Sequence, residues 1–233
     1  MSTIATTNIK EPSSATNNIT LTSGGDTTIN GNATISGTPT LGGLTYPTAD
    51  GTANQVLTTN GSGTLSFADN ITYSTAQSTT SGTSPIEFTD VPTGVKKITI
   101  IFDDVGTDTA SDIVNVQLST SASYVTTGYV STSTRTQNAS TSVSQSMTTG
   151  FIIGQLDNTS KALTGHAVLH NVSGNRWILS GVCSSTEPGD QNRSWNFGGF
   201  LDLGGTIDKL QILGDDDGTY TWDSGQINVM YET

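Results

Sequence analysis

The two histidines of the chain, His166 and His170, are the residues whose type and spacing most directly suggest chemistry, because imidazole is a common metal ligand. They stand four positions apart in the run HAVLH, which reads as part of a β-strand. On a strand both side chains lie on one face, but at about 3.3 Å per residue their Cβ atoms are about 13 Å apart. That separation is too large for one metal ion. We therefore predict no metal site and expect paired core or interface histidines, with a metal ion shared between subunits as the alternative.

Runs of aspartate are the next candidates, since calcium prefers several oxygen ligands in one turn. Asp215, Asp216 and Asp217 precede Gly218, but they lack the alternating spacing of a calcium-binding loop. We expect a turn between strands there. A second acidic group is expected to form a solvated loop, and its members are Asp103, Asp104, Asp108 and Asp112.

No recognisable catalytic set is present. Glycoside hydrolysis requires two carboxyl groups about 5 to 9.5 Å apart across a groove, a distance that sequence does not give. The chain contains no Gly-x-Ser-x-Gly turn and no phosphate-binding glycine loop followed by Lys and Ser or Thr. We predict that the chain is not an enzyme, has no catalytic residue and needs no cofactor.

Aromatic side chains offer a different chemistry, because the apolar face of a sugar ring can lie on an indole. The candidates are Trp177, Trp195, Trp222, Tyr220 and Tyr231. Trp177 stands in an alternating apolar run and is predicted to be a core residue. Trp195 follows a polar, turn-rich loop, residues 187–194, of the kind that carries binding residues on a β scaffold. We therefore predict that Arg193 and Trp195 contact a receptor.

The composition indicates an all-β protein. Of the 233 residues, 32% are hydrophobic and only 12% are charged. A disordered chain with so few apolar residues normally carries many charges, whereas this one is filled with Thr, Ser, Gly and Asn, which suit sheets and turns. The formal net charge of −12 repels phosphate groups, so we predict no nucleic-acid partner.

Neither a membrane-spanning segment nor a secretory signal is expected. No apolar run approaches the length of a span, and the start of the chain lacks a basic stretch followed by an apolar one, so we predict no membrane insertion. Cys183 is the single cysteine, which excludes a disulfide framework within the chain. We expect it to be a small buried hydrophobic residue.

The beginning of the chain is poor in apolar side chains. Residues 1–18 form a polar arm, and residues 19–45 contain three short β-prone runs separated by turn residues. Ile19, Ile29 and Ile35 each mark one run. They are too few for a monomeric core but sufficient for a slender β shaft in which three chains share one apolar axis. A flexible linker rich in Thr and Gly is the alternative.

Residues 46–84 are predicted to form a hairpin junction followed by a linker or outer strand. Strands are expected at Gln55–Thr59 and Thr64–Ala68, and the Asn60-Gly61 pair between them favours positive φ at both positions of a tight turn. Because an isolated hairpin is marginal in water, its apolar side chains need cover. These side chains are Val56, Leu57, Leu65 and Phe67. Two further copies of the chain would cover them, and an ordinary hairpin in a monomeric sandwich is the alternative.

The order of short motifs in this junction is distinctive. Tyr46-Pro47-Thr48-Ala49-Asp50-Gly51 is followed by Gln55-Val56-Leu57, by Asn60-Gly61-Ser62-Gly63 and by Leu65-Ser66-Phe67. This succession resembles a junction in many tailed-phage fibre proteins, where it precedes the C-terminal domain of a trimeric tail fibre or a related virion appendage. Asn54, Asn60 and Phe67 stand where that family usually has Gly, Asp and Trp.

The N-terminal arm carries a second likeness. The run from Ile9 to Ile19 resembles the start of several marine-phage structural proteins. A polar arm of this length without a core of its own is normally frayed unless it is tied down, so we expect it to dock on a larger particle. The predicted docking residues are Ile4, Ile9, Lys10, Glu11 and Pro12.

Residues 85–233 are predicted to form a C-terminal, jelly-roll-like antiparallel β-sandwich. Ten strands are expected, at Ile86–Val91, Val95–Phe102, Ile113–Ser119, Tyr124–Val130, Thr149–Gln155, Ala162–Asn171, Arg176–Cys183, Trp195–Leu201, Ile207–Leu213 and Gly225–Tyr231. The ending from Tyr220 to Tyr231 resembles the terminal strand of jelly-roll domains in phage tail and head-fibre proteins.

These resemblances imply a homotrimeric tail fibre on the virion. It would dock on a tail adaptor or hub and bind a host-surface glycan or protein by multivalent adhesion. The alternative is a capsid decoration or head-fibre protein bound to the major capsid protein, and the number of copies per virion separates the two. A bacterial extracellular adhesin is disfavoured because no signal peptide is expected.

Overall fold

The fold is known from a computed structural model that describes residues 35, 37–75, 77–78, 84–108, 112–121, 123–137, 142–156, 159–186, 193–214 and 221–233. The chain divides into two compact units, Met1–Thr52 with Leu57–Phe67, and Ala53–Val56 with Ala68–Thr233. Several predictions fall outside the described residues. They are the docking residues Ile4, Ile9, Lys10, Glu11 and Pro12, the shaft residues Ile19 and Ile29, the turn at Asp215–Gly218, and Tyr220.

Two small hairpins make up the described N-terminal strands. Strand β1 (Thr40–Leu41) pairs with β2 (Leu44–Thr45), and Gly42 and Gly43 between them both have positive φ. Strand β3 (Gln55–Thr59) pairs with β4 (Leu65–Asp69). None of the residues 35 and 37–73 is buried. These strands therefore have no core of their own in the single chain.

The loop of the second hairpin differs from the predicted tight turn. Gly61 and Gly63 have positive φ, at 74° and 85°, but Asn60 does not. Instead the Asn60 side-chain oxygen accepts hydrogen bonds from the backbone N–H groups of Ser62 at 2.8 Å and Thr64 at 3.1 Å. Asn60 therefore closes the five-residue loop 60–64 with its side chain, and the expected positive φ at this residue is wrong.

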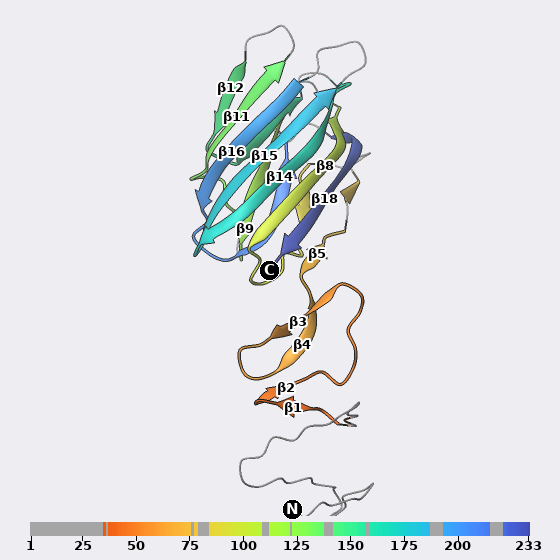
Figure 1. Cartoon of the computed structure of the whole chain (residues 1–233). Helices are drawn as coiled ribbons and strands as arrows, with labels where there is room; N and C mark the ends of the chain where they lie inside the picture. The colour runs from red at the N-terminus through yellow and green to blue at the C-terminus, as the bar shows by residue number, and fades with distance from the viewer. Residues whose placement is uncertain are drawn as a thin grey trace, which may run out of the picture. The chain divides into compact units, whose positions relative to one another are not determined.

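The second unit contains a nine-stranded antiparallel sheet whose strands run side by side (Figure 1). In spatial order they are β12 (Val143–Met147), β11 (Val130–Gln137), β16 (Arg193–Asp202), β15 (Arg176–Thr186), β14 (Ala162–Ser173), β8 (Lys97–Thr107) and β18 (Trp222–Glu232), with β5 (Ile71–Tyr73) and β6 (Gln77–Ser78) both beside β18.

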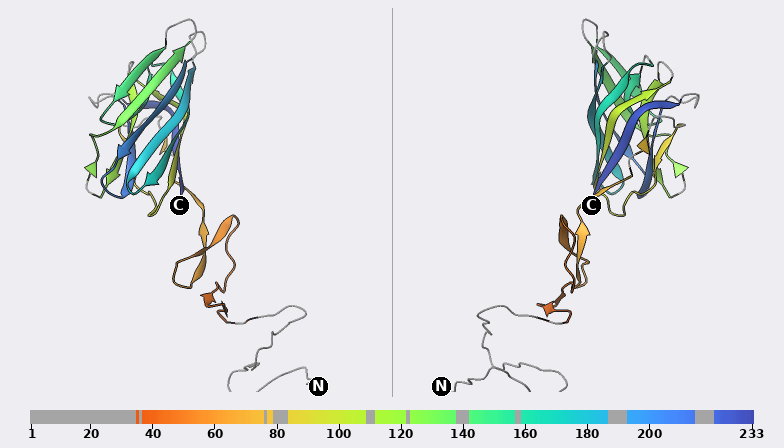
Figure 2. Two further views of the ribbon diagram at one scale, coloured as in Figure 1. Left: turned by 60° about the vertical axis from the view of Figure 1, so that its left-hand side comes forward. Right: turned by 90° about the vertical axis from the view of Figure 1, so that its right-hand side faces the viewer.

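A five-stranded antiparallel sheet forms the other layer (Figure 2). It consists of β10 (Ser123–Tyr124) and β13 (Phe151–Leu156), which both pair with β9 (Asp112–Thr120), then β17 (Ile207–Leu213) and β7 (Ile86–Phe88). The described residues contain no helix and no closed barrel. The all-β prediction is confirmed.

Alternation of apolar and polar side chains places the core between the two sheets. On β8 the side chains of Ile98, Ile100 and Phe102 are buried, while Ile101 between them is 40% exposed on the outer face. The core of the sandwich also receives buried side chains from β9, β13, β15, β17 and β18. The hydrophobic effect of this shared burial is the main force that joins the layers.

Serine hydroxyls link the two layers where β11 faces β13. The Ile152 N–H donates to Ser131 Oγ at 2.9 Å, and Ser133 Oγ donates to the Ile153 carbonyl at 2.9 Å. The ladder between β13 and β9 changes register between Ile152 and Gly154, so the backbone there needs other partners. Buried serines supply them.

The strand predictions are confirmed in part. Gln55–Thr59 and Ile207–Leu213 have the predicted bounds, and the outer-strand alternative for residues 69–84 agrees with β5 and β6. A strand over Tyr124–Val130 is wrong, because β10 ends at Tyr124 and β11 begins at Val130. The solvated loop expected around Asp103 and Asp104 is also wrong, since both belong to β8; Asp112 begins β9.

Burial of the Cys183 thiol predicts a pH dependence of stability. The side chain is 1% exposed, and burial raises the pKa of the thiol from 9.0 to about 12. Because the unfolded state loses this proton first, the free energy of unfolding falls as the pH rises from about 9 toward 12. Between pH 9 and 11 the contribution of this group is about 2 kcal/mol.

Urea unfolding of the wild type and of Cys183→Ala over this pH range measures the effect. The variant starts lower because of its cavity but loses less stability with rising pH. Equal losses in both proteins would contradict the assignment.

A buried hydroxyl gives a second prediction about the fold. Tyr129 is buried edge-on to Phe151, with ring centroids 4.9 Å apart, and its hydroxyl accepts the Leu118 N–H at 2.8 Å. Tyr129→Phe leaves this buried N–H without a partner, so we expect a loss of about 1–3 kcal/mol in the free energy of unfolding. Tyr73→Phe, at an exposed ring, is the control and should change stability by less than about 0.5 kcal/mol.

Candidate functional site

Three adjacent strands of the nine-stranded sheet lose their regular register at the same level. The pairing of β14 with β8 shifts between Leu163 and Gly165. The pairing of β18 with β8 shifts on either side of Ser224. Bulges of this kind bend a strand and redirect its side chains, and they are frequent beside functional sites.

The irregular backbone centres on Asp104. Its φ of +57° is uncommon for a residue with a side chain. Its N–H donates to Thr164 Oγ1 at 3.1 Å, and its carbonyl accepts from Ser224 Oγ at 3.2 Å. Side chains of both neighbouring strands therefore replace the hydrogen bonds that the bulge removes from the ladder.

Gly225 is required at the centre of this arrangement. Its φ is +83°, and a Cβ at this position would lie 2.2 Å from the Asp104 carbonyl oxygen. No other residue type fits without moving the bulge.

A hollow of about 710 Å³ lies beside the bulges on the outer face of β8, β14 and β18. Its size falls within the range of about 300–1,000 Å³ that is common for small-molecule sites. The side chains that give it chemical character are Thr99, Ile101, Asp103, His166, Gln226 and Asn228.

The polar groups of the hollow have defined orientations. Gln226 Nε2 donates to Asp103 Oδ2 at 3.0 Å. Asn228 Oδ1 accepts the Val229 N–H at 2.8 Å, which turns the amide nitrogen of Asn228 away from its own backbone. Ile101 lies between Asn228 and His166, because it is opposite each of them in the two ladders. The hollow thus presents polar groups around the exposed Ile101 side chain, and Asp103, Gln226 and Asn228 among them are held by hydrogen bonds.

The hollow contains few ionisable groups. Asp103 is the one carboxylate among the described residues that line the hollow, whereas glycoside hydrolysis uses a pair. The described part of the chain also contains no group of three His, Cys, Asp or Glu residues that could hold a metal ion. What the hollow provides is hydrogen bonding and an apolar contact.

The predicted receptor residues lie elsewhere and are not exposed together. Trp195 is 1% exposed. Its indole packs against Gly154, where an added Cβ would lie 2.9 Å from the nearest indole carbon atoms. Its ring faces the core, where a sugar could not stack on it. Arg193 is half-buried, and its pKa is lowered by burial and by the nearby Arg135.

The other aromatic candidates among the described residues are core residues as well. Trp177, Trp222 and Tyr231 are all buried, so the core prediction for Trp177 is confirmed. The Tyr231 hydroxyl donates to Asp90 Oδ1 at 2.9 Å, and burial together with this carboxylate raises its pKa. None of the three offers an exposed ring face.

The histidines lie on the outer face of β14, both exposed, and the core alternative for them is wrong. His166 lines the hollow, and His170 does not. Of the predicted trimer-interface residues, Ile35, Val56, Leu57 and Phe67 are exposed and Leu65 is half-buried. None of the described segments forms a helix long and apolar enough to span a membrane.

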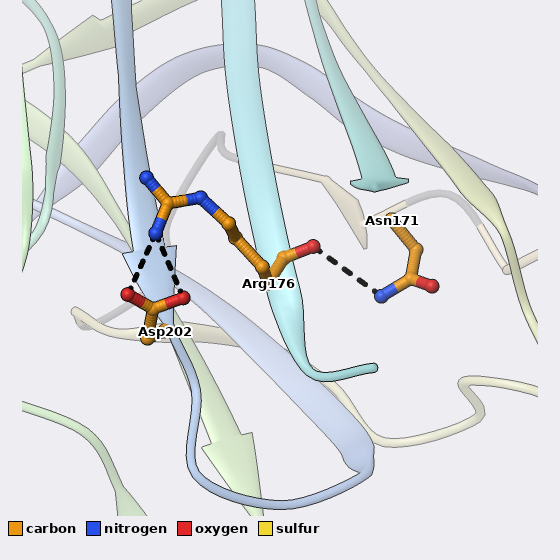
Figure 3. Close-up of polar contacts among 3 residues, drawn as sticks. All are labelled: Asn171, Arg176 and Asp202. Atoms are coloured by element: carbon orange, nitrogen blue, oxygen red, sulfur yellow. Dashed lines mark hydrogen bonds and ion pairs between the residues drawn. The ribbon is translucent and has the colours of Figure 1, made fainter. Parts of the chain in front are cut away.

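A second polar cluster lies at the turn between β14 and β15 (Figure 3). Arg176 Nη1 contacts Asp202 at 2.8 and 3.0 Å, and its guanidinium lies 4.1 Å from the centroid of Phe200. Asn171 Nδ2 donates to the carbonyls of Gly174 and Arg176. The ion pair is exposed and contributes at most about 1 kcal/mol, so the cluster has a structural role at the β14–β15 turn.

No protein-family model, curated protein or solved structure matches this chain. Its function must therefore be inferred from its own residues.

Sequence reasoning missed the hollow because its residues come from three strands that are far apart in the chain. Asp103, His166 and Gln226 become neighbours only through the antiparallel pairing of β14 and β18 with β8. A usable signal was the pair Asp103-Asp104 directly after the apolar run 98–102, since acidic residues within a strand often mark a bulge or an exposed site.

The bulge gives a prediction with a matched control. Gly225→Ala combines a left-handed backbone with a clash, and we expect a loss of about 3 kcal/mol in the free energy of unfolding. Gly204→Ala has a similar φ of +77° but open space around the position, so it should cost only about 1 kcal/mol. Chemical denaturation measures both, and equal losses would contradict the tight contact at Gly225.

Proposed function

We propose that this chain is the subunit of a homotrimeric phage tail fibre that attaches the virion to the host surface. The observation that carries this proposal is that residues 35 and 37–69 include the four strands of two hairpins, β1 to β4, without one buried residue. Two hairpins without a core are marginal in water. Further copies of the same chain are the simplest source of cover.

The exposed side chains of these hairpins support the proposal. Leu41, Val56, Leu57 and Phe67 are large apolar residues, each more than a third exposed in the single chain. Three copies around one axis would bury them in a shared core. At about 25 cal/mol for each Å² of apolar surface removed from water, this burial provides a driving force for assembly.

The junction motifs connect this assembly to the virion. Tyr46-Pro47-Thr48-Ala49-Asp50-Gly51 and the segments after it resemble the junction of trimeric tail fibres. The second unit, a sandwich of two antiparallel sheets, is of the size and class of a jelly-roll head, the finer fold that we propose for it. Three heads on one fibre would bind a surface with an avidity far above that of one head.

Oligomeric state tests the assembly. Sedimentation equilibrium of the full chain should give three times the chain mass. Leu57→Ser combined with Phe67→Ser should shift the equilibrium toward single chains, because both side chains lie on the hairpin. Val172→Ser is the control, since Val172 is at least as exposed as Leu57 and Phe67 but lies on the sandwich.

A single-chain species at nanomolar concentration with ordered hairpins would refute trimer formation. Antibody labelling of purified phage particles tests the position: labels at the tail support a fibre, and labels spread over the head refute it in favour of a decoration protein.

A further inference from the structure

We infer that the hollow on β8, β14 and β18 binds an uncharged saccharide. Asn228 and His166 would hydrogen-bond its hydroxyl groups, Asp103 would accept from them, and Ile101 would support the apolar face of a ring. The inference rests on the proposed adhesive function, because it names the class of ligand to which the fibre would adhere.

The charge of the hollow excludes acidic ligands. Asp103 lines it, and no Lys or Arg does. The two described cations on this face are engaged elsewhere, Lys97 with Glu232 at 2.6 Å and Arg176 with Asp202 at 2.8 Å. In a chain of net charge −12, a phosphate, sulfate or carboxylate ligand would meet repulsion without compensation.

The hydrogen-bonding groups match hydroxyl groups, which both donate and accept. One oxygen of Asp103 accepts from Gln226, and the other remains an acceptor for a ligand. The Asn228 oxygen is used by the Val229 N–H, so the Asn228 nitrogen is the donor presented to the hollow. His166 adds a ring that can donate from one nitrogen and accept at the other.

The exposed Ile101 side chain matches the apolar face of a sugar ring. Ile101 is 40% exposed and flanked by Asn228 and His166 in the ladders. An apolar contact surrounded by convergent polar groups is the usual composition of a small-ligand site. A sugar ring, with C–H groups on its faces and hydroxyls around its edge, fits this pattern.

A peptide is a poorer match. Peptides that bind sheets usually add a strand to an exposed edge, where unpaired backbone groups are available. Strands β8, β14 and β18 are each paired on both sides. Recognition at the hollow must therefore use side chains, whose defined orientations suit a small polyhydroxylated ligand.

The test uses the full chain on an array of immobilised neutral oligosaccharides of glucose, galactose, mannose, rhamnose and N-acetylglucosamine, with sialylated and sulfated oligosaccharides beside them. We expect binding to at least one neutral oligosaccharide and none to the acidic set. Calorimetric titration with the strongest neutral binder should show a loss in affinity of about tenfold or more for Asn228→Ala and for His166→Ala.

Two matched controls separate the hollow from the rest of the face. Asn196 is exposed on β16 in the same lateral row as Asn228, and His170 is exposed on β14 outside the hollow. Asn196→Ala and His170→Ala should keep the wild-type affinity within about twofold. Thermal unfolding of all four variants checks that each is folded.

Absence of binding to every neutral oligosaccharide, binding confined to the acidic set, or equal losses in the controls would overturn the site. A trimeric chain that fails on the array refutes the ligand assignment alone, as expected if a second copy covers this face. A monomeric chain that binds through the hollow refutes the proposed assembly and leaves the site intact.

Discussion

The burial of apolar side chains between two antiparallel sheets is the interaction on which the rest of the structure depends. Ile98, Ile100 and Phe102 on β8 represent this core, which excludes water from both layers. Every buried side chain among the described residues lies at or after Ser74. The sandwich therefore has a core of its own, whereas the hairpins before it have none in the single chain, and isolated hairpins are marginal in water.

The same core allows irregular backbone at the hollow. Asp104 in a left-handed conformation costs about 1–2 kcal/mol, and the shifts in register remove ladder hydrogen bonds. Thr164 and Ser224 replace part of the lost bonding, and the buried side chains beneath hold β8 in place. Strain that is kept by its surroundings in this way tends to occur where side chains must be placed for a purpose.

Sequence alone predicted the strands in which apolar residues alternate, because that pattern directly reports a half-buried sheet. Ile207–Leu213 is such a strand. The alternation pattern did not predict β11 and β12, where Ser and Thr occupy most positions. There the inward-facing Ser131 and Ser133 form hydrogen bonds with backbone groups of β13. These serines can be buried because β13 of the other sheet supplies their hydrogen-bond partners. The local sequence of β11 does not show which backbone groups will face it.

The site was harder to predict for a related reason. Trp195 follows a polar loop, which suggested exposure, yet the strand places its indole inward against Gly154. The hollow instead depends on pairing between strands more than 50 residues apart, as with Asp103 and His166. Side-chain type can indicate chemistry, but the register of the ladders decides which side chains meet.

The proposed saccharide site on the sheet and the proposed trimeric assembly would complement each other energetically. The hollow offers a few hydrogen bonds and one aliphatic contact, each of about 1 kcal/mol net, so one site alone gives weak binding. Its strands are paired on both sides and lie over a packed core, so little ordering is required when a ligand binds. In the proposed trimer, three such sites would convert weak single contacts into firm attachment, because linked sites raise the effective concentration of the second and third contacts. An adhesive protein built as we propose would need no deep pocket, and the exposed hairpins and the hollow on the sheet face would then both serve attachment.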